Sequence, residues 1–133
     1  MGISKSVYDI YKKHPLLFPK NCIKCEEGWL HIIEQMCSAI QVYIDNDISD
    51  VHLEFEFEYI REKFGVLDIS CIGGDKITSI IVKACTKLSY ATCEYCGNQP
   101  AELNCSAKYK QWSVYKTLCL DHAIELYYYK LHK

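Results

Sequence analysis

Two short pairs of cysteine and histidine residues constrain this chain's fold more than any other feature. Cys93 and Cys96 are separated by two residues and followed by Gly97, and Cys119 and His122 repeat that spacing further along. A tight turn between two such residues points both side chains at one ion, and the glycine relieves the backbone that follows. The pattern predicts one tetrahedral Zn²⁺ site with Cys93, Cys96, Cys119 and His122 as its ligands.

The segments around these pairs have the composition of a small zinc finger. Residues 101–107 and 111–117 are rich in strand-forming side chains, and residues 121–133 are predicted to form a helix. The second ligand pair then lies on the first turn of that helix, where the helix dipole favours a bound thiolate. Knuckle, hairpin and helix in this order predict a treble-clef zinc module over residues 91–133.

The predicted zinc is structural, because four protein ligands leave no position for water or substrate. A zinc deaminase would need a His-x-Glu motif on a helix, whereas His52 and Glu54 lie on a predicted strand. An HNH-type nuclease would need a histidine between the two ligand pairs, and the sequence has none there. Cys105 also lies between the pairs and is an alternative to one of the four ligands.

The chain has nine cysteines, and two of them raise the alternative of a second metal. Cys22 and Cys25 repeat the two-residue spacing, and Cys37 is a nearby third candidate. The competing interpretation is that these thiols are free and partly buried. The odd cysteine count and the polar N-terminal segment favour a cytoplasmic protein over a disulfide-bonded secreted one.

Residues 1–90 are predicted to form an α+β body, which is either separate from the zinc module or continuous with it. Short helical patterns cover 4–14 and 29–44, the latter with apolar residues at steps of three and four. Residues 51–72 alternate between apolar and polar side chains and predict an antiparallel hairpin. A third helix begins at Asp75, and we expect its buried stripe to contain Ile77, Ile80, Ile81, Ala84, Cys85 and Leu88.

The charge balance bears on the kind of partner. A net charge of −2 argues against a surface built to hold phosphate backbones, and no segment has the length of a membrane span. Tyr109, Trp112 and Tyr115 lie among lysines near the end of the chain. Such residues can stack on bases, hold a nucleotide or form a protein interface.

The ordered motifs resemble those of a family of small uncharacterised zinc-finger-like proteins encoded by phages, prophages and bacteria. The matching segments are CEEGW (25–29), EYIREKFGVLDI (58–69), CEYCG (93–97) and TLCLDH (117–122). This chain departs from the family after Leu67, where Asp-Ile replaces the more common Arg-Phe. The resemblance implies an α+β body with a zinc-binding tail. It also makes the shared turn at Glu62, Lys63 and Phe64 a candidate functional loop, although Phe64 could instead fill the core.

For function, these observations predict a non-enzymatic zinc-containing binding protein that modulates a host factor. A phage counter-defence or host-takeover protein in the cytoplasm of a bacterial host fits the resemblance. The motivation is that we find no nucleophile–base pair, no phosphate-binding loop and no open metal site. A sponge for a nucleotide second messenger and a nucleic-acid-binding regulator are the alternatives. The sequence does not predict an oligomeric state.

Overall fold

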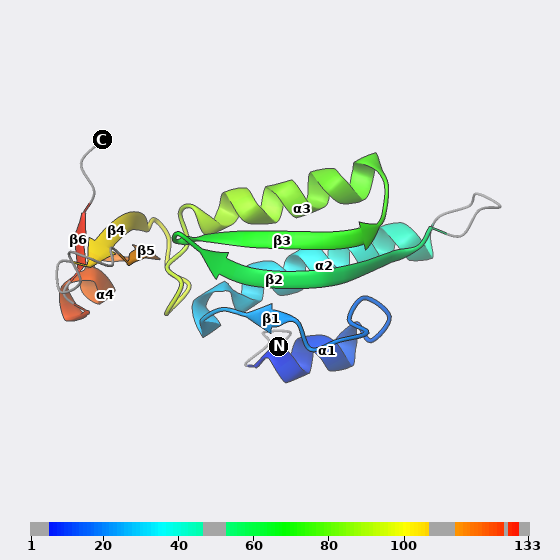
Figure 1. The fold of residues 1–133 in the computed structure, drawn as a ribbon, viewed down its shortest axis with the longest axis horizontal. Coiled ribbons are helices and arrows are strands. Elements are labelled where there is room, and N and C mark those ends of the chain that lie inside the picture. The colour runs from blue at the N-terminus through cyan, green and yellow to red at the C-terminus, as the bar shows by residue number, and fades with distance from the viewer. Residues whose placement is uncertain (1–5, 47–52, 107–113, 127, 131–133) are drawn as a thin grey trace.

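The computed structural model describes residues 6–46, 53–106, 114–126 and 128–130, and it shows a mixed α/β fold with two small sheets (Figure 1). The elements described are α1 (Val7–Lys13), β1 (Ile23–Lys24), the 3-10 turn η1 (Glu27–Trp29), α2 (Leu30–Asp45), β2 (Phe55–Lys63), β3 (Val66–Gly73), α3 (Lys76–Ser89), β4 (Glu102–Ser106), β5 (Tyr115–Leu118), α4 (Leu120–Glu125) and β6 (Tyr128–Lys130). None of the described helices is long and apolar enough to cross a membrane.

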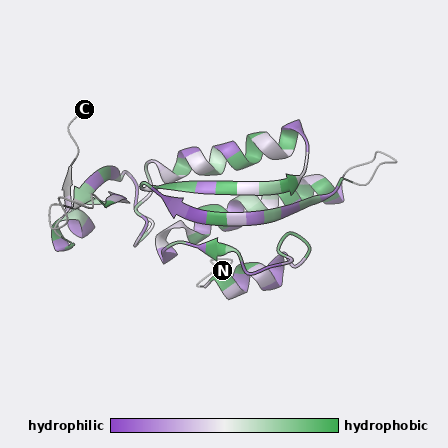
Figure 2. Cartoon of the chain, viewed as in Figure 1, coloured by the Kyte–Doolittle hydropathy of each residue, from purple (hydrophilic) through white to green (hydrophobic). Residues whose placement is uncertain are grey.

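The first sheet has the order β1-β2-β3, and the predicted hairpin is confirmed as β2 and β3. The turn is made by Phe64 and Gly65, both with positive φ, and apolar and polar residues alternate along both strands (Figure 2). A register shift between Phe57 and Tyr59 changes which residues face the core. Ile60 is fully buried as a result, whereas Tyr59 is half-buried and packs against the Arg61 guanidinium.

The main core lies between this sheet and α2, whose predicted amphipathic pattern is confirmed. Phe55, Phe57 and Leu67 contribute from the hairpin. Burial of this many large apolar side chains is the principal stabilisation available to the body. The buried side chains of α2 are Leu30, Ile32, Ile33, Met36, Cys37 and Ile40.

Helix α3 begins where the sequence predicts, but of its expected buried stripe only Cys85 is buried and Ile81 half-buried against the core. The Asp75 carboxylate accepts a bond from the Thr78 amide, and the Thr78 hydroxyl contacts the Asp75 backbone in return. Ile77, Ile80 and Leu88 are 43, 54 and 42% exposed. The described sheet ends at β3, so it covers only one side of α3. Thr78 and Ser89, which the sequence analysis did not expect, are buried together with Cys85.

His14 is a buried polar side chain whose ring nitrogens have no hydrogen-bond partner among the described residues. Burial lowers its pKa below the ordinary 6.5, against the opposing charge of Glu34. The folded protein therefore binds this proton less tightly than the unfolded chain, and stability falls as the pH falls below about 6.5. We expect His14→Phe to lose less stability between about pH 7.5 and 5, measured by urea unfolding. Identical pH profiles for the two proteins would contradict this.

The second sheet has the order β5-β4-β6 and packs around a small apolar cluster. The two strands predicted within 101–107 and 111–117 are confirmed as β4 and β5. They pair in antiparallel fashion. The expectation of one helix over 121–133 is wrong, because α4 ends at Glu125 and β6 follows and pairs with β4. Tyrosine-rich segments favour strands, and pairing with the open edge of β4 satisfies the backbone there.

Candidate metal centre

The first ligand pair lies on a tight turn between α3 and β4. The Gly97 amide donates to the Cys93 carbonyl over 2.8 Å, and the Cys93 amide donates to the Asn98 carbonyl over 2.9 Å. Gly97 has a φ of +82°, which a residue with a Cβ rarely adopts. The glycine after the second cysteine therefore has the role that the sequence predicts for it.

The second ligand pair lies at the start of α4. Cys119 is the residue before the first helical position, and its carbonyl accepts the Ala123 amide over 2.9 Å. His122 follows within the first turn, so its ring and the Cys119 sulfur point to the same place. The imidazole also packs nearly parallel to the Tyr95 ring, with 5.9 Å between the ring centroids.

The four predicted side chains converge. One potential ligand atom from each of Cys93, Cys96, Cys119 and His122 lies within 4.8 Å of the others. The Cys96 and Cys119 sulfurs are 3.7 Å apart, and His122 Nδ1 is 3.6 Å from Cys93 Sγ and 3.3 Å from Cys119 Sγ. Tetrahedral zinc would hold two sulfurs roughly 3.8 Å apart and a sulfur and a nitrogen roughly 3.6 Å apart. The site therefore has the dimensions of a tetrahedral metal centre.

The local electrostatics favour a thiolate at Cys93. Burial alone would raise its pKa, but backbone amides of Cys119, Cys96 and Tyr95 point at the sulfur and lower the pKa to about 7. Cys96 is the more exposed thiol, and desolvation next to the other sulfurs raises its pKa to about 11. A bound cation would favour the thiolate form of both residues. Three sulfurs with one imidazole are a ligand set that suits zinc.

The first turn of the site packs tightly against the body. The Gly28 amide donates to the Glu94 carbonyl over 2.8 Å, and the Trp29 indole donates to the Thr92 carbonyl over 2.8 Å. A Cβ on Gly28 would lie 2.3 Å from the Cys93 carbonyl oxygen. The segment 25–29 therefore packs against the first turn of the candidate metal site, a role that its sequence alone does not indicate.

A partly buried ion cluster lies beside the same turn. Lys116 Nζ contacts Glu62 Oε1 at 2.6 Å and Glu94 Oε2 at 3.3 Å. Glu94 is 0% exposed, and its Oε1 has no partner among the described residues. Burial raises the pKa of Glu94 to about 7, against the opposing effect of Lys116. The Thr117 hydroxyl extends this contact between the hairpin turn and β5 by donating to the Gly65 carbonyl over 2.5 Å.

The remaining cysteines lie apart from this centre. Cys22 and Cys37 are buried in the main core, and desolvation raises the pKa of half-buried Cys25 to about 12. Cys105 lies in β4. Over the described ranges, neither a second group of metal ligands nor an exchange involving these four cysteines is found.

The other predicted binding residues lie in different surroundings. Glu62 is engaged by Lys116, whereas Lys63 is exposed. Phe64 is 68% exposed, so the interpretation that it fills the core is wrong. Its ring lies edge-on to Tyr115, with centroids 6.4 Å apart. Two further candidates, Tyr109 and Trp112, lie outside the described residues.

Comparisons with protein-family models, with curated proteins and with solved structures find no match to this chain.

Proposed function

We propose that this chain is a non-enzymatic binding protein in which a structural Zn²⁺ holds a treble-clef-like module against the α/β body. The observation that carries the proposal is the convergence of four potential ligand atoms, all within 4.8 Å of one another. Such a set is complete without water or substrate, so the metal has no open position for catalysis. The order of knuckle, β4, β5 and α4 supports the treble-clef assignment, with β6 as an addition to it.

A protein is the partner that the surface favours. Ile77, Ile80 and Leu88 leave an apolar stripe exposed along α3, and protein interfaces bury surfaces of this kind. The resemblance to phage and prophage proteins adds that the partner is a factor of the bacterial host. The protein would then act in counter-defence or takeover of that cell.

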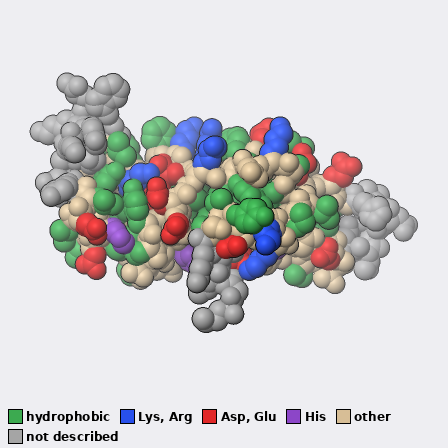
Figure 3. All heavy atoms as spheres, turned by 90° about the horizontal axis from the view of Figure 1, so that it is seen from below, with side chains coloured by type: hydrophobic (Ala, Val, Ile, Leu, Met, Phe, Trp, Pro, Cys, Tyr) green, Lys and Arg blue, Asp and Glu red, His purple; other side chains and the backbone are tan. Residues whose placement is uncertain are grey.

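The surface gives less support to nucleic acid. The net charge is −2, and the face shown in Figure 3 carries lysine and arginine scattered among acidic and apolar side chains. Proteins that follow a phosphate backbone gather their basic residues in a stripe or patch. A nucleotide second messenger stays an alternative ligand, and it depends mainly on the aromatic residues that the sequence places before and at Tyr115.

We expect the zinc-loaded protein to capture one bacterial protein from lysate and to form a stoichiometric complex with it. The captured protein is identified by mass spectrometry, purified and titrated by calorimetry, next to titrations with cyclic nucleotides and duplex DNA. Heat is expected only with the protein partner. Tight nucleotide binding, salt-dependent DNA binding or catalytic turnover of any of these molecules would contradict the proposal.

A further inference from the structure

The outer edge of β3 borders an open groove. Within the described sheet β3 pairs with β2 alone, and α3 runs back alongside it after the turn at Gly73 and Gly74 (Figure 1). Between the strand and the helix lies a groove of about 520 Å³. Ligand sites in proteins commonly measure about 300 to 1,000 Å³.

Backbone groups of β3 point into this groove. Lys63 and Val66 flank the two-residue turn, and residues of an antiparallel pair then alternate between facing the partner strand and facing away. By this alternation the N–H and C=O groups of Leu67, Ile69 and Cys71 face away from β2. Two hydrogen bonds confirm which residues face away. The Leu67 amide donates to Ser89 Oγ over 3.0 Å and so points away from β2. On the partner strand, Ile60 lies opposite Ile69 and its amide donates away from β3, to the Cys22 carbonyl. Ile69 and Cys71 are thus left to pair with an added strand.

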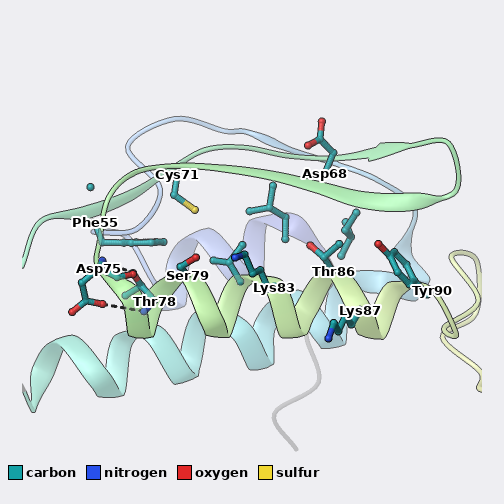
Figure 4. A pocket seen from close by; sticks show the side chains of 14 residues that line it. Phe55, Asp68, Cys71, Asp75, Thr78, Ser79, Lys83, Thr86, Lys87 and Tyr90 are labelled. Carbon is teal, nitrogen blue, oxygen red and sulfur yellow. Dashed lines mark hydrogen bonds between the residues drawn. The ribbon is translucent and has the colours of Figure 1, made fainter.

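The helix supplies the other wall of the groove. Figure 4 shows Cys71 pointing from β3 toward α3, where Ser79, Lys83 and Thr86 stand on the side nearest the strand. Val82 and Ile69 add an apolar floor. An extended segment placed beside β3 would therefore lie over α3, with alternate side chains directed at these residues.

The charges lining the groove favour an acidic occupant. Asp68 is paired with Arg61 at 3.0 Å and points away from the groove (Figure 4). Asp75 is engaged by the Tyr43 hydroxyl at 2.6 Å and by the first turn of α3. Lys83 and Lys87 line the groove one turn apart, and neither forms an ion pair within the described part of the chain. Asp75 keeps its negative charge because both of its partners are neutral. Two lysines against this one carboxylate still leave the groove positive.

We infer that this groove binds an extended acidic segment of a partner protein by strand addition to β3. The backbone of the segment pairs with Ile69 and Cys71, and its carboxylates on the groove side reach Lys83 and Lys87. This inference rests on the proposed function as a protein-binding module and names the chemistry of the partner. A second copy of this chain fits less well, because α3 already packs on both β3 and α2. A second β3 would bring another α3 into the same space.

The test screens the zinc-loaded protein against a displayed library of random peptides as long as β3, which has eight residues. We expect acidic, β-branched sequences to be enriched. The best peptide is then titrated against wild type, the groove variant Lys83→Glu/Lys87→Glu and the control Lys20→Glu/Lys24→Glu, which reverses two exposed lysines elsewhere. Binding should weaken roughly tenfold in the groove variant and stay unchanged in the control.

A backbone readout separates strand addition from charge attraction alone. Saturating peptide should shift the amide resonances of Ile69 and Cys71 and slow their hydrogen exchange. Ile69→Pro removes a backbone N–H that faces the groove and should abolish binding. Since proline in a strand also affects folding, the Lys83→Glu/Lys87→Glu variant is the deciding one. The inference is overturned by a screen without binders, by equal affinity for the groove variant, or by a dimer that protects the β3 edge without peptide.

The outcomes also separate this inference from the proposed function. A partner captured from lysate that binds the groove variant and wild type equally would overturn the groove assignment and leave the binding function intact. Conversely, absence of any captured protein would count against the function, while the peptide titration would still decide the groove.

Discussion

Cys119→Ser should leave the protein without zinc and unfold its C-terminal module. Structural zinc sites contribute on the order of 10–16 kcal/mol in small peptides. The apolar cluster around the ligands has few buried members, namely Ala101, Leu118, Ala123 and the ligand Cys93 itself. Such a cluster cannot replace the metal, because small modules rarely build a sufficient core of their own. The body retains its own core between α2 and the hairpin, so we expect it to stay folded.

Elemental analysis and amide hydrogen exchange measure this outcome. Wild type should contain one zinc per chain, and the amides of β4 and β5 should lose their protection in the variant. Cys105→Ser is the matched control, since this thiol lies in β4 but outside the converging group. Zinc that survives Cys119→Ser, or that is lost from Cys105→Ser, would show that the ligand set is wrong.

Lys116→Met should destabilise the zinc-loaded protein by about 3–5 kcal/mol at about pH 8. Lys116 is the ion-pair partner of Glu94, and it also contacts Glu62. Because burial raises the pKa of Glu94 to about 7, this carboxylate is ionised at that pH. Without the lysine the pKa of Glu94 rises further, because Lys116 is what lowers it. The buried carboxylate must then keep an uncompensated charge or take up a proton, and either costs more than losing the pair's attraction alone.

Urea unfolding of the zinc-loaded variants measures the effect, with Glu94→Gln/Lys116→Met as the matched control. The double variant has no buried charge at this position and should recover most of the lost stability. A single variant as stable as wild type would mean that Glu94 is solvated. Failure of the double variant to recover would mean that Lys116 acts through packing instead.

Local pattern was sufficient for several parts of the fold. Helix α2 and the β2–β3 hairpin follow from periodicity, because a single buried face determines each of them. The metal ligands follow from spacing, because a short turn brings two side chains to one ion. In each case the information lies in the spacing of residue types along the sequence.

Other parts depend on contacts between distant residues. Thr78 and Ser89 are buried in α3 because their hydroxyls bond to nearby or facing backbone, which leaves Ile77 and Ile80 exposed. Glu94 reads as an ordinary surface residue within its motif, and only the approach of Lys116 explains its burial. The β6 strand likewise requires the open edge of β4. The periodicity of a single segment does not predict contacts with residues far away in the sequence.

X-ray absorption at the zinc K edge of the purified protein tests the central claim most directly. A structural site predicts four-coordinate zinc with three sulfurs at about 2.3 Å and one nitrogen at about 2.0–2.1 Å. An oxygen ligand from water, fewer than three sulfurs, or protein that contains no zinc would contradict the account of this centre.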